Sequence, residues 1–336
     1  LFCFGWSKTK QIFYYPNHYV TIFAVIIKDA NSKLIDPFYQ ATHGAAYLGD
    51  SLVLLKSVPD KSVNLILTSP PFALTRKKEY GNKSAEDYVE WFLEFAKEFK
   101  RILKDDGSFV LDLGGAYLPG YPVRAIYQFE LLVRLCKELG FFLAQDFYHY
   151  NPSRLPSPAE WVNVRRVRVK DSVNVVWWLS VTENPKANNR NVLKPYSDSM
   201  KSLLENGYKA KMRPSGHDIS DKFQKDNHGA IPANLLTLAN TESNSAYFRR
   251  CKEAGIKPHP ARFPIEFPKF FIEFLTDKDD LVIDPFAGSN TTGQAAELLQ
   301  RKWLAFEIDS NYLEGSVYRF QEVNDLFAVR DEDGST

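Results

Sequence analysis

Two hydrophobic patterns alternate along the first half of the chain. Short, mostly apolar runs predict strands buried in a parallel sheet, and apolar residues at spacings of three and four predict amphipathic helices between them. The predicted strands are 63–68, 108–113 and 141–150, and the predicted helices are 84–103 and 126–139. Such an alternation of strands and helices is typical of an α/β fold.

The same alternation returns near the C-terminus. A helical stripe of apolar residues covers 267–275, and it is followed by a strand at 281–283, a loop at 284–292, a helix at 293–299 and a strand at 303–308. A glycine-containing strand–loop–helix is usually the first unit of a nucleotide-binding domain. Here it stands last, which indicates a permuted order of the two halves.

Residues 151–258 interrupt this pattern. They are rich in Pro, Asn, Ser, Arg and Lys, and 173–179 is their only clear strand pattern. Residues 151–230 hold 14 Lys and Arg against 8 Asp and Glu, a net charge of +6 in a chain whose total is +1. This concentration of positive charge favours a polyanion such as DNA as the partner of this region.

Composition narrows the class of protein. With 44% hydrophobic and 25% charged residues over 336 positions, the chain predicts a folded globular protein, with neither a signal peptide nor a membrane span. Its three scattered cysteines, Cys3, Cys136 and Cys251, form neither a disulfide framework nor a metal-ligand cluster. We therefore expect a reducing compartment and no metal site.

Residues 284–293 combine the features of a cofactor loop. A strand ends in Asp284, Gly288 permits close approach of a ligand to the backbone, and Asn290 or Thr291 is suited to cap the next helix. Glu307, nineteen residues after Gly288 at the end of the next strand, suits an acceptor for ribose hydroxyls. The alternative is a structural turn beside an exposed glutamate, and the coincidence of these features favours the ligand.

A second motif follows the strand at 63–68. Pro70 and Pro71 cannot continue a central strand, so the turn presents the Pro70 carbonyl to a ligand. Ser69 adds a hydroxyl acceptor, and the ring of Phe72 suits stacking on a planar base. Two acceptors aimed at one point match the two hydrogens of an exocyclic amino group.

Together these motifs resemble the DNA amino-methyltransferases that use S-adenosylmethionine, in the permuted order in which the catalytic half comes first. Residues 69–72 resemble the catalytic S-P-P-[FY] motif, and 284–292 resemble the D-P-F-x-G-[ST]-x-T-T cofactor loop. The resemblance implies a Rossmann-like class I methyltransferase fold: a mixed sheet with helices on both faces, plus an inserted loop-rich target-recognition domain.

Further segments extend the resemblance over about residues 47–325. Residues 48–51 and 259–264 resemble segments that line the cofactor, and 213–219 and 231–236 resemble the target-recognition domain of the PvuII-type cytosine-N4 enzymes. The residues implied in cofactor binding are Asp50, Phe263, Pro264, Asp284, Phe286, Gly288, Asn290, Thr291, Thr292 and Glu307.

The implied division of the chain has five parts. They are an N-terminal accessory segment without an assigned role (1–45), a catalytic half (46–150), a target-recognition region (151–258), a cofactor-binding half (259–325) and an acidic tail (326–336).

The first residue of the catalytic motif separates substrates within this family. Serine there, with phenylalanine fourth, is the pattern associated with cytosine N4, whereas adenine-N6 enzymes usually carry Asp or Asn. Hydrogen bonds from the amino protons to Ser69 and the Pro70 carbonyl favour a pyramidal nitrogen that attacks the methyl group directly. None of the cysteines follows a proline, so the nucleophile of cytosine-C5 methylation is absent. The base has to be flipped out of the duplex.

Alternating basic residues in the insertion are candidates for DNA contact. In a strand or ribbon, their spacing with three valines would bring several cations to one phosphate backbone, although a solvated basic strand is an equally good interpretation. The predicted DNA contacts are Arg165, Arg166, Arg168, Lys170, Arg213, Ser215 and His217. Tyr117, Tyr148, His149 and Tyr150 are candidates for the flipped-base pocket, with packing the better interpretation of each one alone.

The leading hypothesis is therefore a site-specific cytosine-N4 methyltransferase of double-stranded DNA. Adenine N6 on the same scaffold and a catalytically silent DNA-binding relative are the alternatives. A dinucleotide oxidoreductase explains neither Ser-Pro-Pro-Phe nor the late cofactor unit. We expect a monomer in the cytoplasm (the nucleus in a eukaryote), associated with DNA and with no membrane partner. A companion restriction endonuclease fits the resemblance without implying a stable complex.

Overall fold

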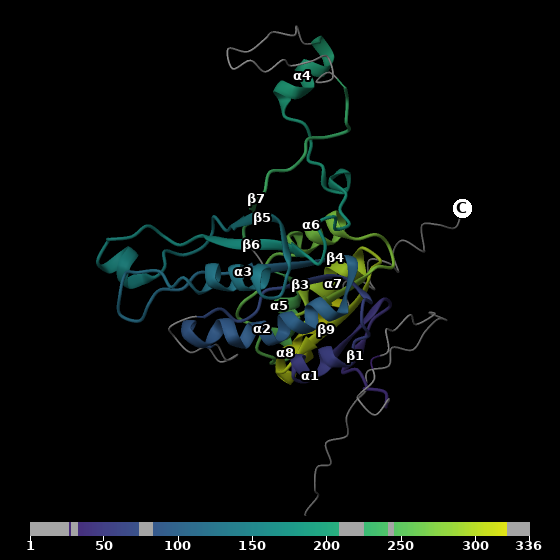
Figure 1. Cartoon of the computed structure of the whole chain (residues 1–336). Coiled ribbons are helices and arrows are strands. Elements are labelled where there is room, and N and C mark those ends of the chain that lie inside the picture. The colour runs from purple at the N-terminus through teal and green to yellow at the C-terminus, as the bar shows by residue number, and fades with distance from the viewer. Residues whose placement is uncertain (1–26, 28–32, 74–82, 208–224, 241–244, 321–336) are drawn as a thin grey trace, which may run out of the picture.

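The computed structural model describes residues 27, 33–73, 83–207, 225–240 and 245–320, and within them nine strands form one sheet (Figure 1). Its order is β1-β2-β9-β8-β3-β4-β6-β5-β7. The strands are β1 (Tyr39–Gln40), β2 (Gly44–Leu48), β3 (Val63–Thr68), β4 (Leu103–Leu113), β5 (Phe142–Tyr150), β6 (Val173–Ser180), β7 (Leu235–Thr237), β8 (Leu281–Asp284) and β9 (Lys302–Glu307).

The sheet is mixed, as predicted. Strands β2, β9, β8, β3 and β4 run parallel to one another, whereas β6 is antiparallel to both of its neighbours, β4 and β5. Strand β1 adds an antiparallel edge to β2, and β7 pairs parallel with β5. The five parallel strands end at the same edge, where loops from all of them meet.

Helices cover both faces of the sheet. Buried residues of α1, α2 and α3 form one apolar cluster with one face, and those of α6, α7 and α8 form a second cluster with the other. The helices are α1 (Ser51–Lys56), α2 (Ala85–Ile102), α3 (Tyr127–Lys137), α4 (Asp198–Asn206), α5 (Ala246–Glu253), α6 (Glu266–Leu275), α7 (Thr291–Leu298) and α8 (Ser310–Ser316). The predicted fold class is thus confirmed.

Helix α2 illustrates how the sequence pattern produces its element. Ser84 caps its first turn by accepting a hydrogen bond from the Asp87 N–H, as the sequence predicts. Its apolar stripe then faces the sheet, with Phe92 and Phe99 fully buried against Phe109 of β4. Burial of these rings contributes on the order of 2 kcal/mol each to the free energy of unfolding.

The sheet takes residues from regions predicted to lie outside it. Strand β6 falls within 151–258, yet it inserts between β4 and β5 in the sheet. Strand β1 and the start of β2 fall within 1–45, and they form one edge. Strand β7 of the same region pairs with β5, whereas α4, which buries no side chain, stands away from the sheet (Figure 1). A target-recognition role for 151–258 stays a prediction.

One expectation about the insertion is wrong. Residues 164–170, in which the basic residues alternate with valines, form no strand or ribbon and pair with no strand of the sheet. Instead, a single π-helical turn spans Glu160–Val164, and the N–H groups of Val167 and Arg168 donate back to the Trp161 carbonyl at 2.8 and 3.2 Å. The valines and the cations of 163–170 are all exposed.

Among the described residues, no helix combines the length and the apolarity needed to cross a lipid bilayer.

Candidate active site

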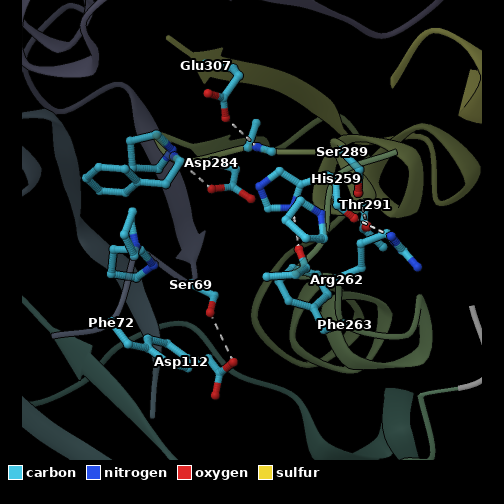
Figure 2. Close-up of a pocket in the computed structure, with 18 of the residues that line it drawn as sticks. Ser69, Phe72, Asp112, His259, Arg262, Phe263, Asp284, Ser289, Thr291 and Glu307 are labelled. Carbon is cyan, nitrogen blue, oxygen red and sulfur yellow. Dashed lines mark hydrogen bonds between the residues drawn. The ribbon is translucent and has the colours of Figure 1, made fainter. Parts of the chain in front are cut away.

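A cavity of about 460 Å³ opens at the carboxyl ends of the parallel strands (Figure 2). The loops after β2, β3, β8 and β9 and the end of β4 all contribute to its wall. In open α/β sheets, this is the edge at which ligands bind. The two predicted motifs, 69–72 and 284–292, therefore lie in one cavity although more than 200 residues separate them.

Asp284 anchors the cofactor loop at the end of β8. Its buried carboxylate accepts hydrogen bonds from the hydroxyls of Thr68 and Thr292, each at 2.7 Å, and from the Phe286 N–H at 3.1 Å. Burial raises the pKa of Asp284 to about 6, against the opposing effect of these donors. The carboxylate thus holds β3, the loop and helix α7 together rather than facing a ligand with free acceptors.

Glu307 and Gly288 face each other across the loop. One carboxylate oxygen of Glu307 accepts from the Gly288 N–H at 2.8 Å, and the other accepts from the N–H groups of Ile308 and Asp309 at 2.9 Å. Burial raises the pKa of Glu307. Gly288 has a φ of +54°, and an added Cβ would lie 3.1 Å from the ring of His259. This position therefore accommodates glycine and little else.

Aromatic side chains form the wall beside Glu307. Phe286 packs against Trp91 and Phe95 of α2, with ring centroids 5.7 and 5.0 Å apart. Asp50 caps α1 nearby, its carboxylate accepting from the N–H groups of Leu52 and Val53. All four side chains line the cavity. The result is an apolar wall of tilted rings with carboxylates at its rim, which suits a purine nucleoside.

The Ser-Pro-Pro-Phe segment forms the opposite end of the cavity. The two prolines end β3, as predicted, and Ser69 turns its hydroxyl toward β4, where it donates to Asp112 Oδ2 at 3.2 Å (Figure 2). The ring of Phe72 lies over the backbone of Gly114, and a Cβ there would overlap the ring. A small residue after β4 thus permits the aromatic side chain to enter the cavity.

A line of polar side chains continues from Ser69. Asn174 of β6 donates to Asp112 Oδ1 at 3.1 Å, and Arg154 donates to the Asn174 Oδ1 at 3.1 Å. Burial raises the pKa of Asp112, while His149, Asn174, Ser69 and Arg154 oppose that rise. Sequence reasoning missed Asp112, Asn174 and Arg154, and the only signal for them was an acid in the otherwise apolar strand 108–113.

His149 also lines the cavity, although packing was the better interpretation of it from the sequence. Of its companions, Tyr117 lines a second hollow that begins on the other side of Phe72, and Tyr148 is partly exposed. His259 belongs to the cavity wall as well, in T-shaped contact with Tyr312 at 4.3 Å. Its burial lowers the pKa of His259 to about 4, so the ring is neutral at pH 7.

Most of the residues expected around the ligand come together. The cavity is lined by Ser69, Pro70, Pro71, Phe72, Asp50, Phe263, Pro264, Asp284, Phe286, Gly288, Thr291 and Glu307. Asn290 and Thr292 are buried behind it: Asn290 caps α7 and donates to the Tyr39 hydroxyl at 2.8 Å, and Thr292 holds Asp284. We therefore describe these two as residues that position the loop.

The predicted DNA contacts lie elsewhere. Arg165, Arg166, Arg168 and Lys170 are exposed and do not line the cavity; Arg165 stacks over Trp161 at 5.2 Å. Arg213, Ser215 and His217 lie outside the described residues. Within the described ranges, no group of three or more His, Cys, Asp or Glu side chains is arranged to hold a metal ion.

Comparison with known proteins gives this geometry a family. Residues 63–318 match the DNA methylase family of the N6 and N4 type. The type II methyltransferase M.PvuII of Proteus hauseri is 57% identical over 291 residues, which cover 86% of this chain and 87% of the relative.

Solved structures agree. The structure of PvuII DNA methyltransferase (cytosine-N4-specific) superposes with a TM-score of 0.70 at 48% identity, covering 87% of this chain and 94% of that one. A DNA modification methylase of Thermus thermophilus, TTHA0409, in complex with S-adenosyl-L-methionine, shares the fold at 18% identity, with a TM-score of 0.51 and coverage of 82% and 94%. The resemblance predicted from the motifs is confirmed, and the chain belongs to the N6/N4 family of DNA methylases.

Proposed function

We propose that this chain transfers a methyl group from S-adenosylmethionine to the N4 amino group of a cytosine flipped out of duplex DNA. The observation that carries the proposal is one cavity that has the Ser69 hydroxyl at one end and the hydrogen-bonded pair of Gly288 and Glu307 at the other. Similarity to M.PvuII and to the cytosine-N4-specific structure confirms the enzyme class and the cytosine substrate predicted from the sequence. The complex of TTHA0409 with S-adenosyl-L-methionine supports the predicted cofactor.

The base end of the cavity suits an exocyclic amino group. The Ser69 hydroxyl donates a hydrogen bond to Asp112, so the lone pairs of the serine oxygen point away from that carboxylate and can accept a hydrogen bond from the amino group. The Pro70 carbonyl is a second acceptor, and Phe72 supplies a face for stacking. As the amino nitrogen forms its bond to the methyl carbon and the carbon–sulfur bond breaks, the nitrogen gains positive charge, and these acceptors stabilise the transition state more than the ground state. The methylated nitrogen then becomes neutral by losing one of its protons to water.

The other end fits the cofactor. Glu307 is a carboxylate acceptor for ribose hydroxyls, Phe286 offers a ring face to adenine, and Gly288 leaves open the space that a Cβ would take. Bound S-adenosylmethionine supplies a methyl group activated by its sulfonium charge. Neutral His259 on this wall adds no repelling charge to a cationic ligand.

The surface around the cavity is the proposed DNA site. The cations of 165–170 are exposed on the loop that follows Arg154, and Arg154 itself reaches the cavity. Phosphate contacts of this kind set the position of the duplex without reading its sequence. We assign sequence recognition to the remainder of 151–258, including Arg213, Ser215 and His217.

The cellular setting follows from the same assignment. Relatives named type II methyltransferases support the proposal that a restriction endonuclease recognising the same site accompanies this enzyme, without a stable complex between them. We place the protein in the cytoplasm with DNA. A monomer suffices, because each strand of a palindrome is methylated in a separate turnover.

The test is the identity of the methylated nucleoside. Purified protein is incubated with labelled S-adenosylmethionine and unmethylated duplex DNA of mixed sequence, and the digested nucleosides are separated by mass spectrometry. We expect N4-methylcytosine, and we expect its loss in Ser69→Ala and in Phe72→Ala. The matched control is Ser62→Ala, since Ser62 is remote from the cavity lining and its hydroxyl bonds to the Pro59 carbonyl.

Two results would contradict the proposal. N6-methyladenine as the product would keep the fold and the mechanism and replace the substrate. Absence of any methylated nucleoside, with cofactor binding retained, would leave a DNA-binding relative without activity. Mapping the methylated positions in the product identifies the recognition sequence for later experiments.

A further inference from the structure

His149 is the buried polar side chain at the base end of the cavity that the proposed mechanism leaves unused. It lies on β5 directly opposite Asn174 of β6, and it is 7% exposed. Its ring stacks on Phe267 of α6, with centroids 5.0 Å apart and planes at 28°. Neither of its ring nitrogens has a hydrogen-bond partner among the described residues. A buried polar group without a partner is costly, so an unpaired one in a cavity wall indicates a ligand atom.

The neighbouring polar groups are already engaged with one another. Asn174 uses its oxygen to accept from Arg154 and its nitrogen to donate to Asp112. Asp112 in turn accepts from Ser69. This satisfied line passes beside His149 without a hydrogen bond to it, so within the described residues the imidazole N–H stays unpaired in the wall of the cavity.

Cytosine carries hydrogen-bond acceptors that could pair with the unpaired N–H of His149. Beside its amino group, the Watson–Crick edge of cytosine carries two acceptors, N3 and O2, and each needs a donor once the base has left its guanine partner. A neutral imidazole carries one N–H in either tautomer. Adenine has only one such acceptor, N1, and a C–H in the place corresponding to O2.

We propose that His149 is a substrate-binding residue that donates a hydrogen bond to an acceptor on the Watson–Crick edge of the flipped-out cytosine, and that it discriminates against adenine where this acceptor is O2. This role rests on the proposed function, because it requires the amino group at Ser69. The stack on Phe267 holds the ring in one plane, so the donor is oriented before the base arrives. A site built to donate to a substrate acceptor discriminates strongly against a base that lacks it.

The experiment uses duplexes carrying the mapped site and three proteins: the unchanged enzyme, His149→Phe and His149→Gln. Phenylalanine keeps the stack and removes both nitrogens, whereas glutamine keeps a donor. We expect kcat/KM on the cytosine duplex to fall about 10- to 100-fold in His149→Phe, the range that corresponds to one lost hydrogen bond that leaves its partner unpaired, and to recover partly in His149→Gln. The Tm of His149→Phe should not fall, because an unpaired buried polar group has been removed.

Two further measurements separate this role from a structural one. S-adenosylmethionine affinity should stay within about twofold in both variants. In addition, kcat/KM is measured on duplexes that carry 3-deazacytosine, which lacks N3, or a pyrimidine without O2 at the target. Both analogues should lower kcat/KM of the unchanged enzyme. One of them should cause no further fall in His149→Phe, because the hydrogen bond is already absent there. The analogue that behaves in this way identifies the acceptor. Tyr148→Phe, which changes the partly exposed neighbour on β5, is the matched control and should behave as the unchanged enzyme.

The outcomes are distinct for the two proposals. If the unchanged enzyme makes no N4-methylcytosine, the proposed function is wrong. If it does, and His149→Phe keeps kcat/KM within about twofold or both analogues slow His149→Phe as much as the unchanged enzyme, only the role of His149 is wrong.

Discussion

The two ends of the cavity treat their buried acids differently. At the cofactor end, Asp284 and Glu307 are each bonded by three donors from their own loop and strand neighbours. At the base end, Asp112 is bonded by side chains from a loop after β3 and from β6, and His149 beside it has no partner among the described residues. At the cofactor end, neighbouring groups of the same site satisfy both acids. At the base end, a buried polar side chain is left without a hydrogen-bond partner in the described part of the chain.

This difference matches what each end has to do. A cofactor present in every turnover is served by a rigid, preformed loop, and the backbone donors around Glu307 supply that rigidity. A base that enters from the duplex needs unpaired hydrogen-bonding groups waiting for it. The hydrogen bonds at the cofactor end therefore stabilise the fold, whereas the unpaired polar group at the base end lowers the free energy of unfolding in exchange for binding a base. Substitutions at the two ends should separate binding, stability and rate.

The largest effect is expected from Asp112→Asn. A neutral amide is a weaker acceptor of the Ser69 hydrogen bond than a carboxylate. Its NH₂ group would also face the NH₂ group of Asn174, so two donors would meet and Ser69 would lose its orientation. We expect kcat to fall about 100-fold, the scale typical of one lost transition-state hydrogen bond. The measurement is single-turnover methylation together with S-adenosylmethionine affinity, which should stay within about twofold. If the affinity for S-adenosylmethionine fell as much as kcat, Asp112 would act on the cofactor end as well as the base end, and the proposed division between the two ends would be wrong.

Asp284→Asn should have the opposite profile. The amide cannot accept from both Thr68 and Thr292, so one buried hydroxyl loses its partner. We expect a loss of about 1–3 kcal/mol in the free energy of unfolding, measured in urea. The displaced loop should weaken cofactor affinity about tenfold, equivalent to roughly 1.4 kcal/mol. An unchanged affinity at reduced stability would mean that Asp284 serves the fold alone.

The pH dependence of stability sharpens the picture within the cofactor end. Burial raises the pKa of Asp284 to about 6, so the stability from its protonation grows as pH falls through 6 and is lost as pH rises through 6. Burial lowers the pKa of His259 from 6.5 to about 4, so the stability it contributes above pH 6.5 is lost as pH falls toward 4. Between about pH 7 and pH 5 each amounts to about 1 to 2 kcal/mol, with opposite signs.

Variants should expose these cancelling contributions. Urea unfolding at pH 7, 6 and 5 should show a steeper loss of stability toward acid in Asp284→Asn than in the unchanged protein, and a shallower loss in His259→Gln. Parallel profiles for all three proteins would contradict the assignment of these groups.

The smallest effect is expected outside the cavity. Arg165→Gln and Arg166→Gln each remove an exposed cation from the proposed DNA surface. If each cation contacts a phosphate, each variant lowers the slope of log affinity against log salt by about 0.9, with kcat on saturating DNA unchanged. Binding titrations from about 50 to 200 mM salt measure the slope. Glu160→Gln, on the same loop, is the charge control, and an unchanged slope in both arginine variants would remove this loop from the DNA site.

The local elements could be predicted because short-range rules govern them. The two prolines end β3, Ser84 caps α2, and Gly288 takes a positive φ, and each of these follows from the residue type itself. The strand or ribbon expected at 164–170 does not form, because a strand requires a partner strand. The alternation of valines and basic residues indicates which side chains would share one face of a strand, but it does not identify a partner strand.

The sequence by itself determined the two motifs, since each is a contiguous run, and the resemblance that these motifs carry implied the family and the mixed α/β fold. Only the tertiary structure decided which side chains complete the site. The insertion of β6 between β4 and β5 brings Asn174 to Asp112 and sets it opposite His149, joining residues 112, 149 and 174 around Ser69. Strand register decides such contacts, because a shift of β6 by one residue would turn Asn174 to the other face of the sheet, away from Asp112 and His149.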